Sequence, residues 1–337
     1  MKRYLVWPLI TVATAALALR LGTVDVDWLE VWAWLNGAGE EMPNTILTHY
    51  RAPRVLAAGL VGAHLAVSGL ILQVILRNPL ADPTIFGVSA GASVAVVASM
   101  SIGFALAPPT NGIVIPSDYV PISAVPFIAL AGALSATGIM MLLAWDGGFQ
   151  PRRMALTGVV LGAVLAAVVM AMVLSLPEAQ TQLAVLWLAG SLYGRDFADI
   201  WPILPWTMLG LAAATACLRP LSVLRFDPAS AQSMGIDSAR LRFWLVFIAA
   251  ALAASAVAIA GPVGFVGLLV PHVARLLAGP DLSSQFWLNI WAGALLVIAS
   301  DAVGRVIISP VEMPVGIVTS LIGAPFFIYL LSRKSLG

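Results

Sequence analysis

The sequence has 337 residues, of which 61% are hydrophobic and only 10% are charged. Soluble domains carry about 25% charged residues, so this composition excludes an ordinary water-soluble globular protein and favours one that lies mostly in lipid. The net charge of +1 gives no indication of nucleic-acid binding, and the single cysteine, Cys217, excludes an intrachain disulfide and a cysteine-based metal cluster.

Uncharged apolar stretches recur along the whole chain, and a membrane-spanning helix needs about 20 such residues. Two stretches are too long for one helix, and Pro108-Pro109 and Gly261-Pro262 interrupt them. The sequence therefore predicts an all-α integral membrane protein with about ten transmembrane helices, forming a single domain over residues 1–337. The predicted helix ranges are 4–19, 55–76, 84–105, 119–145, 154–177, 200–218, 243–260, 262–278, 282–300 and 313–332.

The basic residues predict how these helices are oriented. An even number of helices puts both termini on one side, and the Lys and Arg residues at both ends favour the cytoplasm. Starting from a cytoplasmic N-terminus, 12 of the 17 basic residues fall on the cytoplasmic side. The outer side then carries Arg20, Arg51, Arg54, Arg195 and Arg305.

Two apolar segments need separate treatment. The segment 179–194 is uncharged but short and carries Gln180 and Gln182, so we expect a partial or interfacial helix there. Lys2-Arg3 followed by an uncharged run also fits a cleaved signal peptide. Removal of that run would leave an odd number of helices and break the charge asymmetry, which favours the membrane-spanning interpretation.

The longest polar stretch, residues 219–242, lies on the cytoplasmic side in this topology. Asp227-Pro228 is typical of a helix start, Gly235 of a helix end, and Asp237 of the start of a second short helix. Two short helices would make a rigid docking element for a cytoplasmic partner, although an ordinary surface loop is the simpler alternative.

The residues indicate no catalytic site and no metal site. His49, His64 and His272 have no partners at metal-ligand spacing. His64 lies within a predicted span, where a histidine is either functional or neutral and hydrogen-bonded to a neighbour. The only lysines are Lys2 and Lys334, so the chain has no GxxxxGK[ST] loop, and any ATP that drives it must bind to another chain.

Two further function classes compete with an ATP-driven transporter. An ion-coupled secondary transporter would need carboxylates within the membrane, whereas Asp82, Asp301 and Glu312 lie near predicted helix ends. A membrane enzyme would need a convergent polar cluster within the bilayer, which the sequence does not indicate.

Several long motifs follow one another in a fixed order. GAHLAVSGLILQVILRNPLADPTIFGVSAGA at 62–92 resembles the hallmark segment of the FecCD-type permease family, the membrane subunits of type II ABC importers for iron–siderophores, haem and cobalamin. Further segments are similar to other signatures of this family: RAPR at 51–54, WLAGSLYGR at 187–195, AQSMGI at 231–236, GPVGFVGLLVPHVARLL at 261–277, IASDAVGR at 298–305 and MPVGIVTSLIGAPFFIYLL at 313–331.

The resemblance implies a fold and a set of partners. Members of this family have the helix number predicted here and pair, with an identical or homologous second permease, around a central pathway. An ATP-binding cassette ATPase dimer, which binds the ATP and Mg, docks on the cytoplasmic side, and a periplasmic or extracellular substrate-binding protein delivers the ligand. The chain itself would hold no cofactor, and it would lie in the cytoplasmic (inner) membrane.

The resemblance also implies roles for three arginines. Arg51 and Arg54, placed just outside the second helix, and Arg305, at the outer end of the ninth, match arginines that meet glutamates of the binding protein. Arginine forms bidentate, charge-assisted pairs with carboxylates, which suits this role. The alternative is that they are interfacial anchors whose guanidinium groups reach the membrane surface.

On the inner side, the resemblance implies a gate and a coupling loop. Asn78, Pro79 and Leu80 match the inner gate of a cobalamin relative. Pro79 and Pro83 keep this backbone out of a regular helix, which is tolerated at membrane depth only where protein buries it or it lines a cavity. His272 is interpreted as structural, near the inner end of the eighth helix. The residues matching the ATPase coupling motif are Ala231, Gln232, Ser233, Met234 and Gly235.

The substrate class follows from weaker similarities. The segments WLAGSLYGRDF and EMPVG look most like those of ferric-citrate and siderophore permeases. The predicted function is therefore a pathway for ferric siderophore, with haem as the first alternative and cobalamin as the second.

Overall fold

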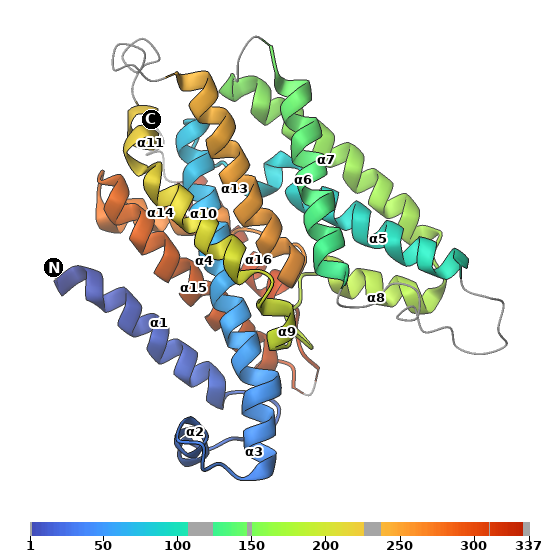
Figure 1. Ribbon diagram of the computed structural model, residues 1–337, viewed down its shortest axis with the longest axis vertical. Helices are drawn as coiled ribbons and strands as arrows, with labels where there is room; N and C mark the ends of the chain where they lie inside the picture. Colours follow the sequence, from blue (N-terminus) through green and yellow to red (C-terminus); the bar gives the residue numbers. More distant parts are fainter. Residues whose placement is uncertain (1, 107–123, 147–149, 226–236, 310, 333–337) are drawn as a thin grey trace.

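Helices make up every regular element in the described part of the chain, which comprises residues 2–106, 124–146, 150–225, 237–309 and 311–332 of a computed structural model. They pack around a central helix, α4 (Ala52–Ile75), with α1 (Lys2–Arg20) and α15 (Leu282–Val306) on one side of it (Figure 1). The predicted all-α fold is confirmed.

Within those ranges, six apolar helices are long enough to cross a bilayer and four more are shorter. Together they match the predicted spans in number and order, while the cytoplasmic placement of both termini stays a prediction. The remaining spans are α5 (Val88–Leu106), α6 (Val125–Ala144), α7 (Pro151–Leu174), α10 (Leu204–Ala216), α13 (Ser238–Ala260), α14 (Val266–Ala278) and α16 (Val315–Ser332).

Shorter helices occupy the connections. The helix α8 (Glu178–Leu188) confirms the partial helix predicted near 179–194. The helices α2 (Trp28–Leu35) and α3 (Glu41–Thr45) lie beyond the end of α1 at one tip of the molecule (Figure 1). The others are a 3-10 turn η2 (Pro83–Phe86), α9 (Phe197–Ile200) and α11 (Leu218–Val223).

The central helix is longer than predicted. It runs without interruption from Glu41 to Ile75, 35 residues, because α3 continues through a π-helical turn, η1 (Ile46–Arg51), into α4. Pro53 has no N–H to donate to the preceding turn, and a wider turn accommodates this loss. The predicted helix began at residue 55, which placed Arg51 and Arg54 just outside it. In the structure both residues lie inside a helix.

Glycines allow neighbouring helices to approach α4 closely. A Cβ atom at Gly62 would lie 2.0 Å from the carbonyl oxygen of Gly293 in α15, and one at Gly69 would lie 1.9 Å from that of Gly267 in α14. Both contacts are with backbone, which no rotamer change can move. The small residues of α4 thus serve tight helix packing, as helices in lipid require.

Two helix boundaries, those at the starts of α13 and α14, differ from the prediction. Asp237 does not begin a separate short helix, because its side chain accepts hydrogen bonds from Ala239 and Arg240 and caps the 23-residue helix α13. The helix α14 begins at Val266 and not at residue 262, because Gly261 and Phe265 both have positive φ, 69° and 67°, which interrupts the chain between the two helices.

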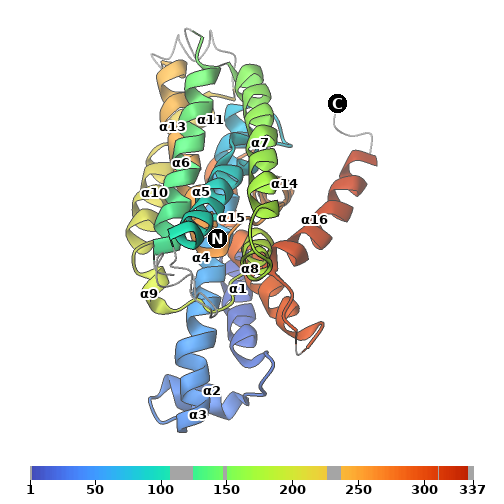
Figure 2. The ribbon, with the colours of Figure 1, turned by 90° about the vertical axis from the view of Figure 1, so that its right-hand side faces the viewer.

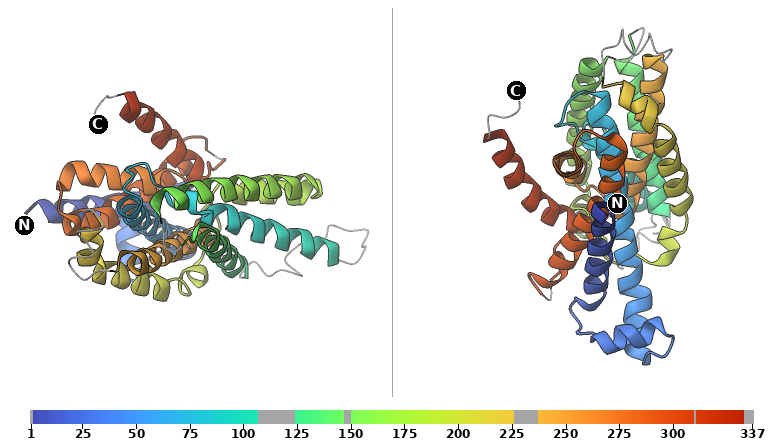
Figure 3. Two further views of the ribbon diagram at one scale, coloured as in Figure 1. Left: turned by 90° about the horizontal axis from the view of Figure 1, so that it is seen from above. Right: turned by 90° about the vertical axis from the view of Figure 1, so that its left-hand side faces the viewer.

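The last helix stands apart from the others. In two side views α16 diverges from the bundle, whereas α5, α6 and α7 lie together on the side of α4 away from α1 (Figure 2, Figure 3). The helix α16 keeps contact with α14 and α15. Residues of α16 therefore face residues of α14 across the space between the two helices.

Candidate functional site

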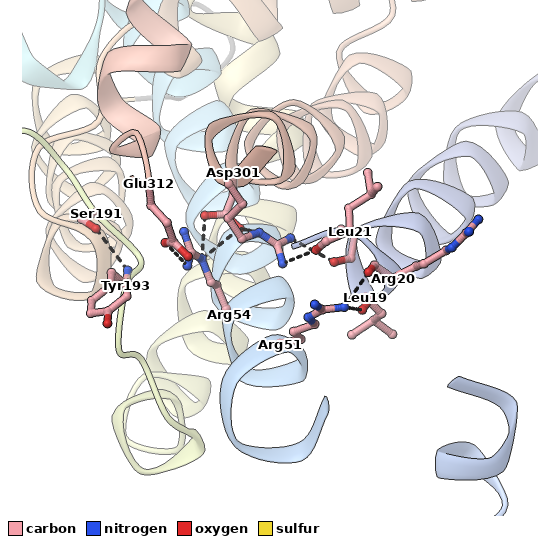
Figure 4. A network of polar contacts seen from close by, with 11 residues as sticks. Leu19, Arg20, Leu21, Arg51, Arg54, Ser191, Tyr193, Asp301 and Glu312 are labelled. Carbon is pink, nitrogen blue, oxygen red and sulfur yellow. Dashed lines mark hydrogen bonds and ion pairs between the residues drawn. The ribbon is translucent and has the colours of Figure 1, made fainter. Parts of the chain in front are cut away.

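The basic residues predicted on the outer side lie together, and Figure 4 shows three of them, Arg20, Arg51 and Arg54, in one network of polar contacts. Four of the five line a single pocket of about 350 Å³, and the fifth, Arg20, offers its backbone carbonyl to one of them. This clustering is expected if the helices alternate in direction as predicted. We call the pocket the outer arginine pocket; its charged lining residues are Arg51, Arg54, Arg195, Arg305 and Glu312.

Two of these arginines donate hydrogen bonds to backbone carbonyls at the end of α1. Arg51, which is 5% exposed, donates to the carbonyls of Leu19, Arg20 and Val24. Arg305, which is 3% exposed, donates to the carbonyl of Leu21 at 2.9 Å and to that of Ala18 at 3.0 Å. The last carbonyls of a helix lack intrahelical donors and favour cations, so both side chains stabilise α1 against α4 and α15.

Arg54 belongs to a buried ion network. Its Nε donates to both carboxylate oxygens of Asp301, at 2.9 and 3.1 Å, and its Nη1 donates to Glu312 Oε2 at 2.6 Å. Arg305 Nε lies 3.2 Å from Asp301 Oδ2, as an ion pair without hydrogen-bond geometry. Asp301 lies toward the C-terminal end of α15, as predicted, but its side chain is buried, with 2% exposed. Its position is explained by the two arginines that neutralise it.

Arg195, the fourth arginine of the pocket, has fewer polar partners than the other three. Arg195 follows α8 and lies 3.9 Å from Asp199, its closest carboxylate. Its Nε is buried without a hydrogen-bond acceptor, and burial lowers the pKa of its guanidinium while Asp199 opposes that shift. Within the pocket lining, four guanidinium groups meet one carboxylate, that of Glu312. This lining favours a further carboxylate.

At the opposite end of α4, two of the three predicted gate residues line a small cavity. Pro79 and Leu80 meet residues of α14 and α16 around a volume of about 10 Å³, which holds no more than about one water. Asn78 is not part of this lining, and its Oδ1 accepts a hydrogen bond from the Leu80 N–H at 2.9 Å. The residues opposite are Leu268, Leu269, His272, Gly323, Phe326 and Phe327.

The predicted coupling loop, Ala231, Gln232, Ser233, Met234 and Gly235, lies outside the described residues, as does the predicted helix start at Asp227-Pro228. The segment that precedes the loop contacts the end of the bundle at which α4 ends. Arg77 donates to the carbonyl of Leu224, and Arg225 donates to the carbonyl of Pro280 and to Gln285 Oε1. The chain leading to the loop therefore contacts both the end of α4 and the start of α15.

The histidines within the bundle take structural positions. His64 is fully buried, and its Nδ1 lies 2.9 Å from Ser255 Oγ, which matches the alternative of a histidine hydrogen-bonded to a neighbour. His272 lies in α14 and borders the cavity that Pro79 and Leu80 line, and its predicted place near the inner end of that helix stays a prediction. Among the described residues, no three His, Cys, Asp or Glu side chains are grouped so as to hold a metal ion.

Comparison with known proteins places this geometry in a family. The profile of the FecCD transport family matches residues 10–333. The chain belongs to the FecCD transport family. Its solved relatives include an ABC transporter of the metal-chelate type in an inward-facing conformation, with a TM-score of 0.82, 26% identity, and coverage of 98% of this chain and 99% of that one. The FecCD resemblance of the motifs and the importer permease fold are thus confirmed.

Individual FecCD relatives match over 80–95% of their own length. The Fe(3+) dicitrate transport permease FecD of Escherichia coli is 37% identical, over 95% of this chain and 94% of its own. The iron(3+)-hydroxamate permease FhuG of Bacillus subtilis is 34% identical, over 97% and 95%. The cobalamin permease BtuC of Halobacterium salinarum is 36% identical, over 97% and 80%.

Sequence reasoning missed several residues that organise this FecCD-family chain. Asp301 and Glu312 were interpreted as edge carboxylates, although they hold Arg54. Arg195 was placed on the outer side but given no role. Gln73, a buried glutamine in α4, received no attention. The signal that pointed to it is its polarity, because a glutamine within an apolar span is expensive unless it is hydrogen-bonded.

Proposed function

We propose that this chain is the permease subunit of an ABC importer for ferric citrate or ferric siderophores, acting as one transmembrane domain of the cytoplasmic membrane. The match to the FecCD transport family over residues 10–333 carries this proposal. Because Lys2 and Lys334 are the only lysines, the chain has no phosphate-binding P-loop. ATP hydrolysis, with its ATP and Mg, is therefore assigned to a separate ATPase dimer.

The proposed assembly has two further partners. A second permease, identical or homologous, completes the pathway, and a periplasmic or extracellular binding protein delivers the chelate. The ATPase dimer docks on the coupling loop, for which Ala231, Gln232, Ser233, Met234 and Gly235 remain the proposed contact. The contacts of Arg77 and Arg225 near that loop would transmit its movement to the inner cavity.

The outer arginine pocket is the proposed docking site for acidic side chains of the binding protein. Arg51, Arg54 and Arg305 line it together with Arg195, for which the family resemblance had implied no docking role. The burial of these side chains favours a carboxylate that enters the pocket over one that pairs on an open surface. Charge-assisted pairs formed away from water are stronger than exposed ones.

Glu312 occupies one of the positions that an incoming carboxylate would use. Its side chain is 22% exposed and pairs with Arg54 Nη1 at 2.6 Å. Glu312→Gln removes the competing negative charge while Asp301 still holds Arg54. We expect about tenfold tighter binding of the binding protein to the complex in nanodiscs, equivalent to about 1.4 kcal/mol, as measured by its Kd.

Glu41→Gln provides the matched control. Glu41 lies in the first turn of α3 at the same end of the molecule, where its side chain is exposed and does not line the pocket. The control removes the same charge without touching the pocket, so its Kd should change by less than about twofold. Equal tightening in both variants would show a general charge effect, and no tightening in Glu312→Gln would remove Glu312 as a competitor.

Pro79 and Leu80 are the proposed inner gate, with Asn78 shaping the turn that presents them. The cavity between them and α14 and α16 is narrow and apolar, which suits a constriction that excludes water and ions. The polar turn of Asn78 holds Leu80 toward that constriction through its hydrogen bond.

Cobalamin is the second candidate substrate, because a cobalamin permease is 36% identical over 97% of this chain. Haem, the first alternative from the sequence, becomes the third candidate. ATP hydrolysis by the assembled complex distinguishes these substrates, since a loaded binding protein stimulates the ATPase only when the complex accepts it. We expect stimulation with ferric citrate or a ferric siderophore. Stimulation by cobalamin or haem alone would keep the transporter class and change the substrate.

A further inference from the structure

The side chain of Gln73 uses both ends of its amide deep within the bundle. It is 3% exposed and lies on the inner half of α4. Its Nε2 lies 3.2 Å from the carbonyl oxygen of Leu268, 3.3 Å from that of Gly267 and 3.4 Å from that of Ala81. Its Oε1 accepts from Arg275 Nη2 at 2.8 Å. One side chain thus connects α4 to α14 and to the irregular segment after α4.

The carbonyls that Gln73 contacts lie where helical hydrogen bonding is broken. Pro271 lies within α14 and has no N–H, so the carbonyl of Gly267 lacks the donor that an α-helix supplies four residues later. Ala81 lies between α4 and η2, outside any helix. Backbone groups within a bilayer must find partners inside the protein, because lipid offers none. Gln73 supplies a donor at both breaks.

Arg275 sets the orientation of this amide. Because a guanidinium can only donate, it selects the carbonyl oxygen of Gln73 and leaves the amide nitrogen facing the backbone carbonyls. A carboxylate at this position would still pair with Arg275 but would turn an acceptor toward other acceptors. The site is therefore specific for an amide.

The connected segments form two walls of the inner cavity. Pro79 and Leu80 contribute one wall, and Leu268, Leu269 and His272 contribute the wall from α14. Close packing reinforces the connection, because a Cβ atom at Gly267 would lie 2.5 Å from Pro83 Cδ. The third wall, Gly323, Phe326 and Phe327 of α16, is not bound by Gln73.

We propose that Gln73 is the positioning residue of the inner gate, holding residues 79–80 and α14 together as one unit. This proposal rests on the proposed transport function, although the contacts of Gln73 do not depend on it. It follows that the gate opens between this unit and α16, where His272 meets Phe326 at a ring separation of 6.3 Å, and not between residues 79–80 and α14. The divergence of α16 from the bundle is consistent with this boundary (Figure 2).

The first test replaces Gln73 by methionine, which keeps a similar volume and removes every hydrogen bond. The variant is made in a Cys217→Ser background with Leu80→Cys as a reporter, and the complex with its ATPase is held in nanodiscs. We expect the rate of thiol labelling at position 80 to rise about tenfold, because a detached segment exposes it more often. Labelling at the parent rate would overturn the proposal.

Ser68→Ala is the matched control for this test. Ser68 lies on the same helix, is fully buried, and donates one hydrogen bond to the carbonyl of Ala249 in α13, at 2.7 Å and away from the gate. Its loss should leave labelling at position 80 within about twofold of the parent. An equal rise in both variants would mean that any lost hydrogen bond loosens the bundle, which would also overturn the specific role of Gln73.

Cross-linking tests the boundary without altering Gln73. A cross-link between Leu80→Cys and Leu269→Cys joins two parts of the proposed unit, so its yield should differ by less than about twofold between the ATP-bound and the nucleotide-free complex. A cross-link between His272→Cys and Phe326→Cys spans the proposed boundary, so its yield should fall strongly in one of these two states. The reverse pattern would overturn the proposal. Labelling at position 80 needs no substrate, so a failure of the proposed transport function would leave that result readable.

Discussion

Replacing Asp301 with alanine is expected to destabilise the protein by about 3–5 kcal/mol, the cost of removing one partner from a buried ion network. Asp301 is 2% exposed and pairs with both Arg54 and Arg305. Its removal leaves two guanidinium groups buried at the outer end with only Glu312 to balance them. The expected result is a large fall in the thermal unfolding midpoint of the protein in nanodiscs.

The pair of Arg153 and Asp146 supplies the control. Both side chains are exposed, 42% and 66%, so this pair is screened by water and contributes about 0–1 kcal/mol. Asp146→Ala should therefore leave the unfolding midpoint nearly unchanged. A similar midpoint for Asp301→Ala would show that the buried network contributes little, and that Arg54 and Arg305 are held by other contacts.

Gly69→Ala is expected to separate α14 from α4. The added Cβ would lie 1.9 Å from the carbonyl oxygen of Gly267, and a backbone atom cannot rotate away. One helix must shift, which costs about 1–3 kcal/mol or more in a packed core. The same shift would lengthen the hydrogen bond between Gln73 and Gly267, so we expect both a lower unfolding midpoint and faster labelling at position 80.

Gly162→Ala serves as its counterpart. Gly162 lies in α7 and has open space where a Cβ would be placed. Alanine favours a helix over glycine by about 1 kcal/mol, so this variant should be as stable as the parent or more stable. An unchanged unfolding midpoint for Gly69→Ala would contradict the close approach of α4 and α14.

The spans were predictable because a bilayer requires long apolar helices, and long uncharged apolar stretches can be recognised directly in a sequence. The clustering of the outer arginines followed in the same way from the alternation of helices and the distribution of charge. The ends of the helices were less predictable. The extension of α4 through residues 41–51 depends on a π-helical turn, and the start of α14 depends on a positive φ at Phe265, which a non-glycine residue rarely adopts.

The partners of the arginines could not be predicted. Arg54 and Asp301 are 247 residues apart, and only the packing of α4 against α15 brings them together. The burial of Arg51 against the end of α1 likewise depends on where α1 stops. Motif similarity indicated which arginines matter, whereas the structure adds that they also stabilise the outer end. Their docking role stays a prediction that the binding measurements decide.

The most direct test of the central claim is uptake of radiolabelled ferric citrate or ferric siderophore into proteoliposomes. These contain the permease and its ATPase, with ATP enclosed and the loaded binding protein outside. We predict that iron accumulates inside only when ATP is enclosed and both partners are present. Accumulation without ATP, or none with ATP in a fully assembled complex offered each of the candidate chelates, would contradict the assignment as an ABC importer permease.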